Sequence, residues 1–135
     1  MLIDNNRSSG AVVMFVGLVR DFNPHMSSEQ VTGLRLEHYP KMTESQLASI
    51  VKRARERWFL SEVRVIHRVG DLDINEQIVF VGVSSRHRES AFEAAQYIMD
   101  YLKHEATFWK KERTQTGEHW VTPDEKEQER LNRYK

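Results

Sequence analysis

Four stretches of the chain predict β-strands. In two of them apolar residues follow one another without a break, and in the other two apolar and polar residues alternate. Residues 11–17, and residues 77–83 after Gln77, are continuous apolar runs rich in β-branched side chains, a pattern typical of strands buried on both faces. Residues 31–39 alternate instead, with leucines on one face and charged side chains on the other, so this strand is expected to be half-exposed. Residues 63–68 alternate in the same way and predict a further strand.

Helical spacing predicts two amphipathic helices. Pro40 is expected to stop the strand before it, and Thr43–Gln46 forms a capping-box pattern that opens a helix over about residues 44–58. Ser90–Glu93 is a second capping box and opens a helix that reaches about Lys103. At 100° per residue, Lys103 falls on the edge of the apolar stripe of this helix and is expected to be partly sheltered. The stripe consists of Phe92, Ala95, Ile98, Met99 and Leu102.

Polar and turn-forming segments connect these elements. Residues 21–30 are polar and predict a long loop, and a turn region is expected to begin at residues 70–71. Residues 108–114 and 119–121 flank a short polar segment at 115–118, which predicts a hairpin.

The order strand, strand, helix, strand, strand, helix, strand, strand predicts an α+β fold, with two helices on one mainly antiparallel sheet.

Residues 122–125 look like a further helix start with proline at its first position. Leu131 and Tyr134 are the only sizeable apolar residues beyond it, so a surface helix or a fraying end is expected. We therefore expect residues 1–135 to form a single domain, with 122–135 as a surface tail.

Composition narrows the class of protein. A length of 135 residues with 39% hydrophobic and 30% charged residues fits one globular domain. The start of the chain has no signal-peptide pattern, and no apolar run is long enough to cross a bilayer, so we expect a cytoplasmic protein. The formal net charge is zero, which argues against a protein that coats nucleic acid. The chain has no cysteine, so it cannot itself supply a disulfide, a thiolate zinc site, or a cysteine nucleophile or persulfide.

The first candidate functional group consists of three lysines, Lys103, Lys110 and Lys111. A cation suits the C-terminal end of a helix, and lysines protect an edge strand from aggregation, so structural explanations exist for all three. The flanking aromatic residues and the position of Lys103 favour a functional role, because a partly desolvated lysine near other cations has a lowered pKa and is suited to proton transfer or nucleophilic attack.

Two further segments could bind an anion. Residues 84–88, with the sequence Ser-Ser-Arg-His-Arg, connect a predicted buried strand to a predicted helix start, where backbone amides and arginines can hold an anion. A polar turn in which Ser90 merely caps the helix explains the segment equally well. Arg20 follows the first apolar strand and could clamp a phosphate or carboxylate at the same end of the sheet.

Two other site classes are less well supported. The six histidines show no metal-binding spacing, so we expect no metal site, and His38 and His67 are expected to be strand residues with satisfied hydrogen bonds. Residues 108–111 could stack RNA bases and hold phosphates, but the chain lacks the signature of an RNA-recognition motif and has no basic excess.

Six stretches resemble the large, catalytic subunit of molybdopterin synthase. They are GAVVMFVGLVR, LEHYPKMTE, VIHRVGDL, IVFVGVSSRHRESAFEA, YIMDYLKHEATFWKKE and GEHWV, and they extend from Gly10 to Val121. The resemblance implies an α/β hammerhead fold, compatible with the predicted order of elements.

The resemblance also implies a reaction and its partners. Members of this family add two sulfurs to cyclic pyranopterin monophosphate, which forms the dithiolene of molybdopterin in molybdenum cofactor biosynthesis. The sulfur arrives as a thiocarboxylate on the C-terminal Gly-Gly of a small ubiquitin-like partner subunit. The large subunit is a homodimer within a heterotetramer. The chain is accordingly expected to be a sulfurtransferase with no cofactor of its own.

The matching motifs imply which residues act. The lysines of YLK and FWK are Lys103 and Lys110, the catalytic and substrate-contacting lysines of the family. The substrate-binding positions implied by the same matching are Arg20, His87, Arg88, Lys103, Lys110 and Lys111. An alternative is a non-catalytic partner-binding module of the same fold, which Leu18 would favour because relatives often have lysine there.

Overall fold

The computed structural model describes residues 9–21, 31–105, 108–114, 117–120 and 131–134. The predicted loop at 21–30 and the predicted helix start at 122–125 fall outside these residues, apart from Asp21. The elements are β1 (Ala11–Leu18), β2 (Val31–His38), α1 (Pro40–Arg57), β3 (Leu60–His67), β4 (Gly70–Asp73), β5 (Gln77–Ser85), α2 (Arg88–Glu105), β6 (Phe108–Thr114), β7 (Gly117–Trp120) and a 3-10 turn, η1 (Asn132–Tyr134).

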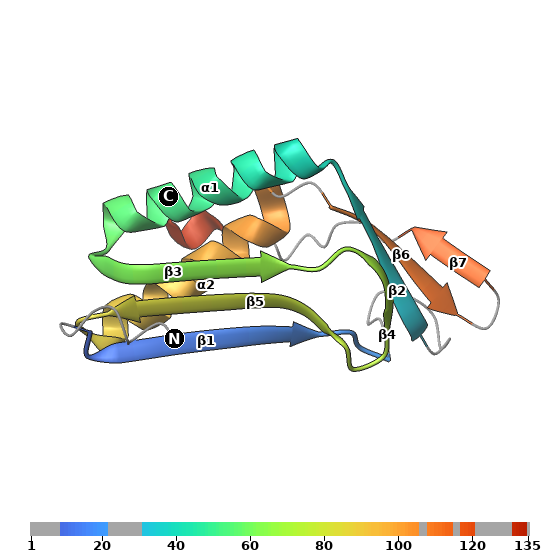
Figure 1. Cartoon of the computed structure of the whole chain (residues 1–135), viewed down its shortest axis with the longest axis horizontal. Coiled ribbons are helices and arrows are strands. Elements are labelled where there is room, and N and C mark those ends of the chain that lie inside the picture. Colours follow the sequence, from blue (N-terminus) through green and yellow to red (C-terminus); the bar gives the residue numbers. More distant parts are fainter. Residues whose placement is uncertain (1–8, 22–30, 106–107, 115–116, 121–130, 135) are drawn as a thin grey trace.

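The described strands form two antiparallel sheets in place of the single sheet expected from the sequence. The first has the order β1-β5-β3, and the second has the order β4-β2-β6-β7. Figure 1 shows both helices against the first sheet, with the second sheet standing beyond its end. The predicted α+β class, with antiparallel strands and two main helices, is confirmed. The predicted hairpin is β6–β7.

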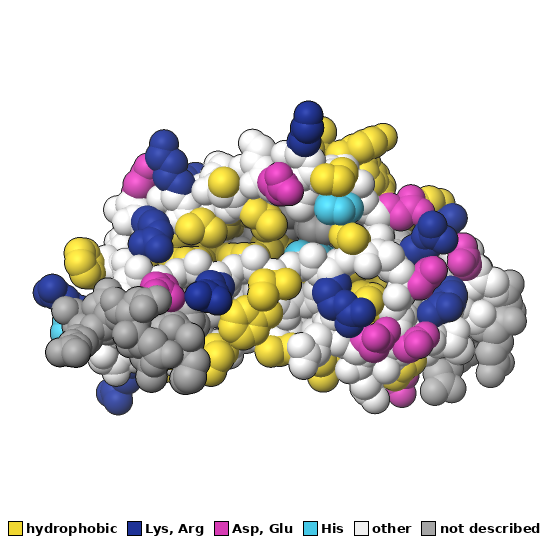
Figure 2. Space-filling view, in the orientation of Figure 1, with side chains coloured by type: hydrophobic (Ala, Val, Ile, Leu, Met, Phe, Trp, Pro, Cys, Tyr) yellow, Lys and Arg dark blue, Asp and Glu magenta, His cyan; other side chains and the backbone are white. Residues whose placement is uncertain are grey.

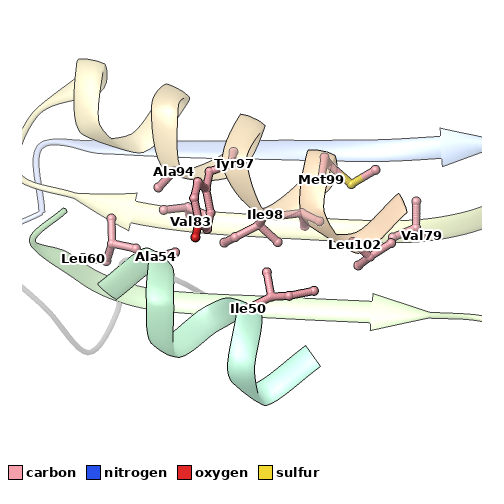
Figure 3. Packing of buried hydrophobic residues seen from close by; sticks show 12 residues of the cluster. Ile50, Ala54, Leu60, Val79, Val83, Ala94, Tyr97, Ile98, Met99 and Leu102 are labelled. Carbon is pink, nitrogen blue, oxygen red and sulfur yellow. The ribbon is translucent and has the colours of Figure 1, made fainter. Parts of the chain in front are cut away.

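The main core lies between the two helices and one face of the first sheet (Figure 3). Every second residue of β5 faces the helices, and Val81 and Val83 are fully buried there. Ile50 from α1 and Ile98 from α2 pack onto this face and are also fully buried. One face of the apolar run in β5 and the apolar stripes of α1 and α2 therefore meet in one cluster.

The prediction that β1 is buried on both faces is wrong for this chain. Met14 and Val16 lie on the face of β1 turned away from the helices and are 65% and 41% exposed. An apolar run shows that a strand can be buried on both faces, but it does not show that the same chain provides the second cover.

Both helices begin earlier than their capping boxes predict. Pro40 does not merely stop β2; it opens α1, where its missing N–H is no loss because the first helical amides lack a partner within the helix. Thr43 is buried, and its hydroxyl pairs at 3.1 Å with the Nδ1 atom of His38. Similarly, α2 begins at Arg88, so Ser90 lies within the helix.

A second, smaller core joins the two sheets. Leu34 and Leu36 alternate on the inner face of β2, as predicted, and pack with Val19 and with Leu72 of β4. The region from Gly70, predicted as a turn, is therefore a short strand that contributes a buried leucine to this core.

The described end of the chain packs against the helices and does not fray. Leu131 is 3% exposed, and the Tyr134 ring lies 4.9 Å from that of Tyr97 on α2. The Tyr134 hydroxyl donates a 2.6 Å hydrogen bond to the buried carboxylate of Asp100. The expectation of a surface tail is therefore wrong for residues 131–134.

Candidate functional site

Lys110 lies on β6, in the second sheet. One face of this sheet carries the leucines of the second core. In the register of the sheet Lys110 pairs with Leu36, and Glu112 pairs with Leu34. Directly paired side chains of antiparallel strands lie on the same face, so Lys110 shares its face with the second core. Its own side chain is exposed.

Lys103 lies in the last turn of α2, two residues before the helix ends at Glu105. The expectation that it is partly sheltered is wrong, because its side chain is exposed. The reason lies in the predicted stripe: Phe92, whose angular position Lys103 shares, is itself 62% exposed, so the buried stripe is narrower. Only two residues separate α2 from β6, so Lys103 and Lys110 lie at the same end of the molecule.

Arg20 belongs to the same end. It follows β1, and the backbone N–H of the preceding residue, Val19, donates a hydrogen bond to the carbonyl of Glu76, just before β5. Val19 is part of the second core between the sheets. Arg20, Lys103 and Lys110 thus come from the ends of β1 and α2 and from β6, around the junction of the two sheets (Figure 1).

His87 and Arg88 lie at the opposite end of α2. This helix has 18 residues, which at 1.5 Å per residue separates its ends by about 27 Å. The prediction that Arg20 lies at the same end of the sheet as residues 84–88 is wrong, because β1 and β5 are antiparallel and Leu18 pairs with Gln77. One copy of the chain does not bring all the predicted site residues together.

The serines of the predicted anion-binding segment have structural partners. Ser84 and Ser85 are the last residues of β5 and are buried. The Ser84 hydroxyl accepts a hydrogen bond from the Glu62 amide, and the Ser85 hydroxyl donates one to the Phe59 carbonyl. Of this segment, the exposed side chains of residues 86–88 are the ones accessible to a ligand.

Lys111 is separated from Lys110 by the alternation of β6. Its ammonium lies 4.5 Å from the centre of the Trp120 ring and 3.7 Å from the carboxylate of Glu118, both on β7. Consecutive strand residues point to opposite faces, so Lys111 shares the outer face with Trp109, and Lys110 does not. This arrangement also divides the predicted RNA-stacking segment between two faces.

His67 is a residue near this site whose importance the sequence did not reveal. It is the last residue of β3, and its Nδ1 atom lies 2.8 Å from the carbonyl oxygen of Arg68. Burial lowers the pKa of His67 to about 4; the hydrogen bond to the Arg68 carbonyl opposes this shift, and electrostatic interactions with Lys110 and His38 add to it. The expectation that His38 and His67 are strand residues with hydrogen bonds is confirmed. The sequence does not show how the two sheets pack, and this packing brings the end of β3 close to His38 of β2 and Lys110 of β6.

No group of three or more histidine, aspartate or glutamate side chains among the described residues could hold a metal ion. Within the same residues, no helix is both long and apolar enough to cross a membrane.

Comparison with known proteins gives a consistent family. The profile of the family described as MoaE protein matches residues 1–105. The chain is 54% identical over 125 residues to the molybdopterin synthase catalytic subunit of Escherichia coli (strain K12), which covers 93% of this chain and 81% of that protein.

Solved structures with the same fold agree. Molybdopterin synthase from Staphylococcus aureus matches with a TM-score of 0.80 and 34% identity, over 87% of this chain and 83% of that chain. A complex of subunits 1 and 2 of molybdopterin-converting factor from Helicobacter pylori 26695 contains a chain of the same fold. It has a TM-score of 0.70 and 20% identity, over 86% of this chain and 74% of that chain.

Proposed function

The chain belongs to the MoaE family and acts as a catalytic subunit of molybdopterin synthase, an enzyme of the sulfurtransferase kind in molybdenum cofactor biosynthesis, and from this we propose its donor, its substrate and its assembly. The sulfur donor is the C-terminal thiocarboxylate of a small ubiquitin-like subunit that ends in Gly-Gly. The acceptor is cyclic pyranopterin monophosphate, which becomes the dithiolene of molybdopterin.

The observation that carries this proposal is the group of cations at the junction of the two sheets. Arg20, Lys103 and Lys110 are exposed and come from separate elements around that junction. Both reactants are anionic, since the acceptor has a phosphate and the donor ends in a thiocarboxylate. Positive side chains on different elements can attract both anions to one place and hold them there.

The two lysines are proposed to have different roles. Lys103 acts as general acid or base at the carbon that receives sulfur, or steadies the acyl intermediate of the donor. Lys110 orients the carbonyl of the donor tail and stabilises the negative charge that develops on its oxygen. Since the chain has no cysteine, the sulfur must come from another molecule.

We propose that the donor is brought by a protein partner. The related fold from Helicobacter pylori was solved as a complex of two subunits of molybdopterin-converting factor, which supports a two-subunit enzyme. A tail that enters from a partner needs an open approach to Lys103 and Lys110, and both side chains are exposed.

We propose further that two copies of the chain associate, and that each copy completes the site of the other. The open face of the first sheet exposes Met14, Val16 and Ile66, the last at 59%, and Figure 2 shows hydrophobic side chains gathered over this side of the molecule. Exposed apolar patches of this kind are typical of interfaces. A second copy would also supply His87 and Arg88 to Lys103 and Lys110, which one chain keeps at opposite ends of α2. With the small subunits, the assembly is a heterotetramer.

Substitution of the two lysines tests the proposed chemistry. The chain is mixed with thiocarboxylated small subunit and cyclic pyranopterin monophosphate, and the dithiolene product is followed by mass spectrometry. Lys103→Ala is expected to lower the rate by about 10²–10⁴-fold through loss of proton transfer. Lys110→Ala is expected to lower it by about 10²–10³-fold through loss of oxyanion stabilisation.

Lys52→Ala is the matched control, because Lys52 is an exposed lysine in the middle of α1. It should leave the rate unchanged. A parental rate in Lys103→Ala would contradict its role. If the parent chain binds the small subunit but forms no product, only the alternative function remains, that of a non-catalytic partner-binding module.

A further inference from the structure

His67 is the last residue of β3, which ends on the side where the second sheet stands (Figure 1), and it interacts electrostatically with Lys110 of that sheet. His67 pairs with the buried Val79 of β5. Strand alternation places it on the same face as Val63 and Val65, which pack against the main core. This face looks toward the helices, so the imidazole is partly buried between the main core and the second sheet.

The hydrogen bond of His67 to the main chain fixes its tautomer. A carbonyl oxygen can only accept, so the Nδ1 atom of His67 donates to the carbonyl of Arg68, 2.8 Å away. In a neutral imidazole the other nitrogen, Nε2, then carries the lone pair and is an acceptor.

The surroundings keep this ring neutral. Burial is the largest cause of its lowered pKa. The hydrogen bond to Arg68 acts against this shift, whereas electrostatic interactions with Lys110 of β6 and His38 of β2 add to it. His38 is itself engaged through Nδ1 with the Thr43 hydroxyl at the start of α1. With a pKa of about 4, His67 carries no charge at neutral pH.

We propose that His67 is a positioning residue for Lys110, in which Nε2 accepts a hydrogen bond from the lysine ammonium and fixes it where the carbonyl of the donor tail arrives. The inference rests on the proposed function, since it assigns a partner to a lysine of that site. A neutral acceptor suits this task. A carboxylate in the same place would pair with Lys110 and cancel the charge that an anionic tail requires, whereas an imidazole orients the ammonium and leaves its charge intact.

Two substitutions at His67 separate positioning from packing. In His67→Asn the amide occupies the place of Nδ1 and can keep the bond to Arg68, but nothing remains at the place of Nε2. In His67→Gln the amide oxygen reaches the place of Nε2. For the complete enzyme with its small subunit, His67→Asn is expected to lower kcat about tenfold or more, as loss of one charge-assisted hydrogen bond implies. His67→Gln is expected to recover most of that loss, and KM for cyclic pyranopterin monophosphate should change little in either variant.

A double-substitution cycle shows whether His67 acts through Lys110. In a Lys110→Ala background, His67→Asn should produce little further loss of kcat, because the ammonium that it positions is gone. An equal loss in both backgrounds would overturn the proposal, as would a parental kcat in His67→Asn.

A measurement on the chain without substrate distinguishes this inference from the proposed function. The ¹⁵N resonances of the His67 ring are recorded by NMR at neutral pH and through a pH titration. We expect Nδ1 to be protonated, Nε2 to shift when Lys110 is replaced by alanine, and the pKa of His67 to rise in that variant. An Nε2 resonance and a pKa that Lys110→Ala leaves unchanged would refute the pairing, whether or not the enzyme transfers sulfur.

Discussion

At the scale of the residue, the surroundings give a side chain its chemical character. His67 and His104 are both histidines of the same chain, but His104 is an exposed residue in the last turn of α2. His67 is partly buried, hydrogen-bonded to the main chain and close to a lysine from another strand. The same reasoning separates Lys110 from Lys111, since one step along β6 turns the second lysine to the other face, where it meets Trp120.

The lowered pKa of His67 predicts a pH-dependent stability. The pKa is about 4 in the folded chain and 6.5 in the reference state, so the unfolded chain binds the proton more readily. This group therefore contributes stability that is present above about pH 6.5 and lost as the pH falls towards about 4. Urea unfolding of the parent and of His67→Gln across this range should show a steeper loss for the parent. Equal slopes would contradict the assignment.

At the scale of the element, contacts between elements decide where helices begin and whether an end is fixed. The side chain of Thr43, expected to cap α1, is buried within the helix against His38. The described end of the chain packs on α2 through Tyr134, which also lies under the guanidinium of Arg57.

Removal of one hydroxyl tests that packing. Tyr134→Phe keeps the ring but loses the 2.6 Å hydrogen bond to Asp100, whose carboxylate is buried in α2. The free energy of unfolding is expected to fall by about 1–3 kcal/mol, since a buried acceptor loses a donor. Tyr39→Phe removes a hydroxyl from a tyrosine that is 63% exposed and should change stability little. Chemical denaturation of both variants makes the comparison, and equal stabilities would show that the bond contributes nothing.

At the scale of the whole molecule, the site residues form two groups at the two ends of α2. Arg20, Lys103 and Lys110 surround the junction of the sheets, and His87 and Arg88 start the helix. In the dimer that we propose, a second copy binds the exposed apolar face of β1 and β3 and brings the two groups together.

Mixing two inactive variants tests this assembly. Lys103→Ala and Arg88→Ala are each expected to be nearly inactive alone. If each site draws on two copies, exchange of subunits creates mixed dimers with one intact site, and about a quarter of the parental activity should return. No recovery, with subunit exchange demonstrated by native mass spectrometry, would place each complete site within a single copy. Ile66→Asp, which puts a charge on the open sheet face, should give a monomer by light scattering and prevent the recovery.

The sequence by itself determined the elements and the chemical types of the site. Local periodicity is a property of consecutive residues, so every described strand except β4, both helices, the β6–β7 hairpin and the inward leucines of β2 could be predicted. The motifs around Lys103 and Lys110 were enough to indicate the family, which the comparisons established.

Only the tertiary structure decided which strands and side chains become neighbours when they are distant in the sequence. The division into two sheets, the exposed face of β1 and the separation of Arg20 from Arg88 depend on pairing between strands distant in sequence. The approach of Lys110 to His67 depends on how the two sheets pack against each other. Register and direction of pairing fix the first three, and no local pattern encodes any of these features. The cationic group around Lys103 and Lys110 is therefore a product of antiparallel pairing as much as of the residues themselves.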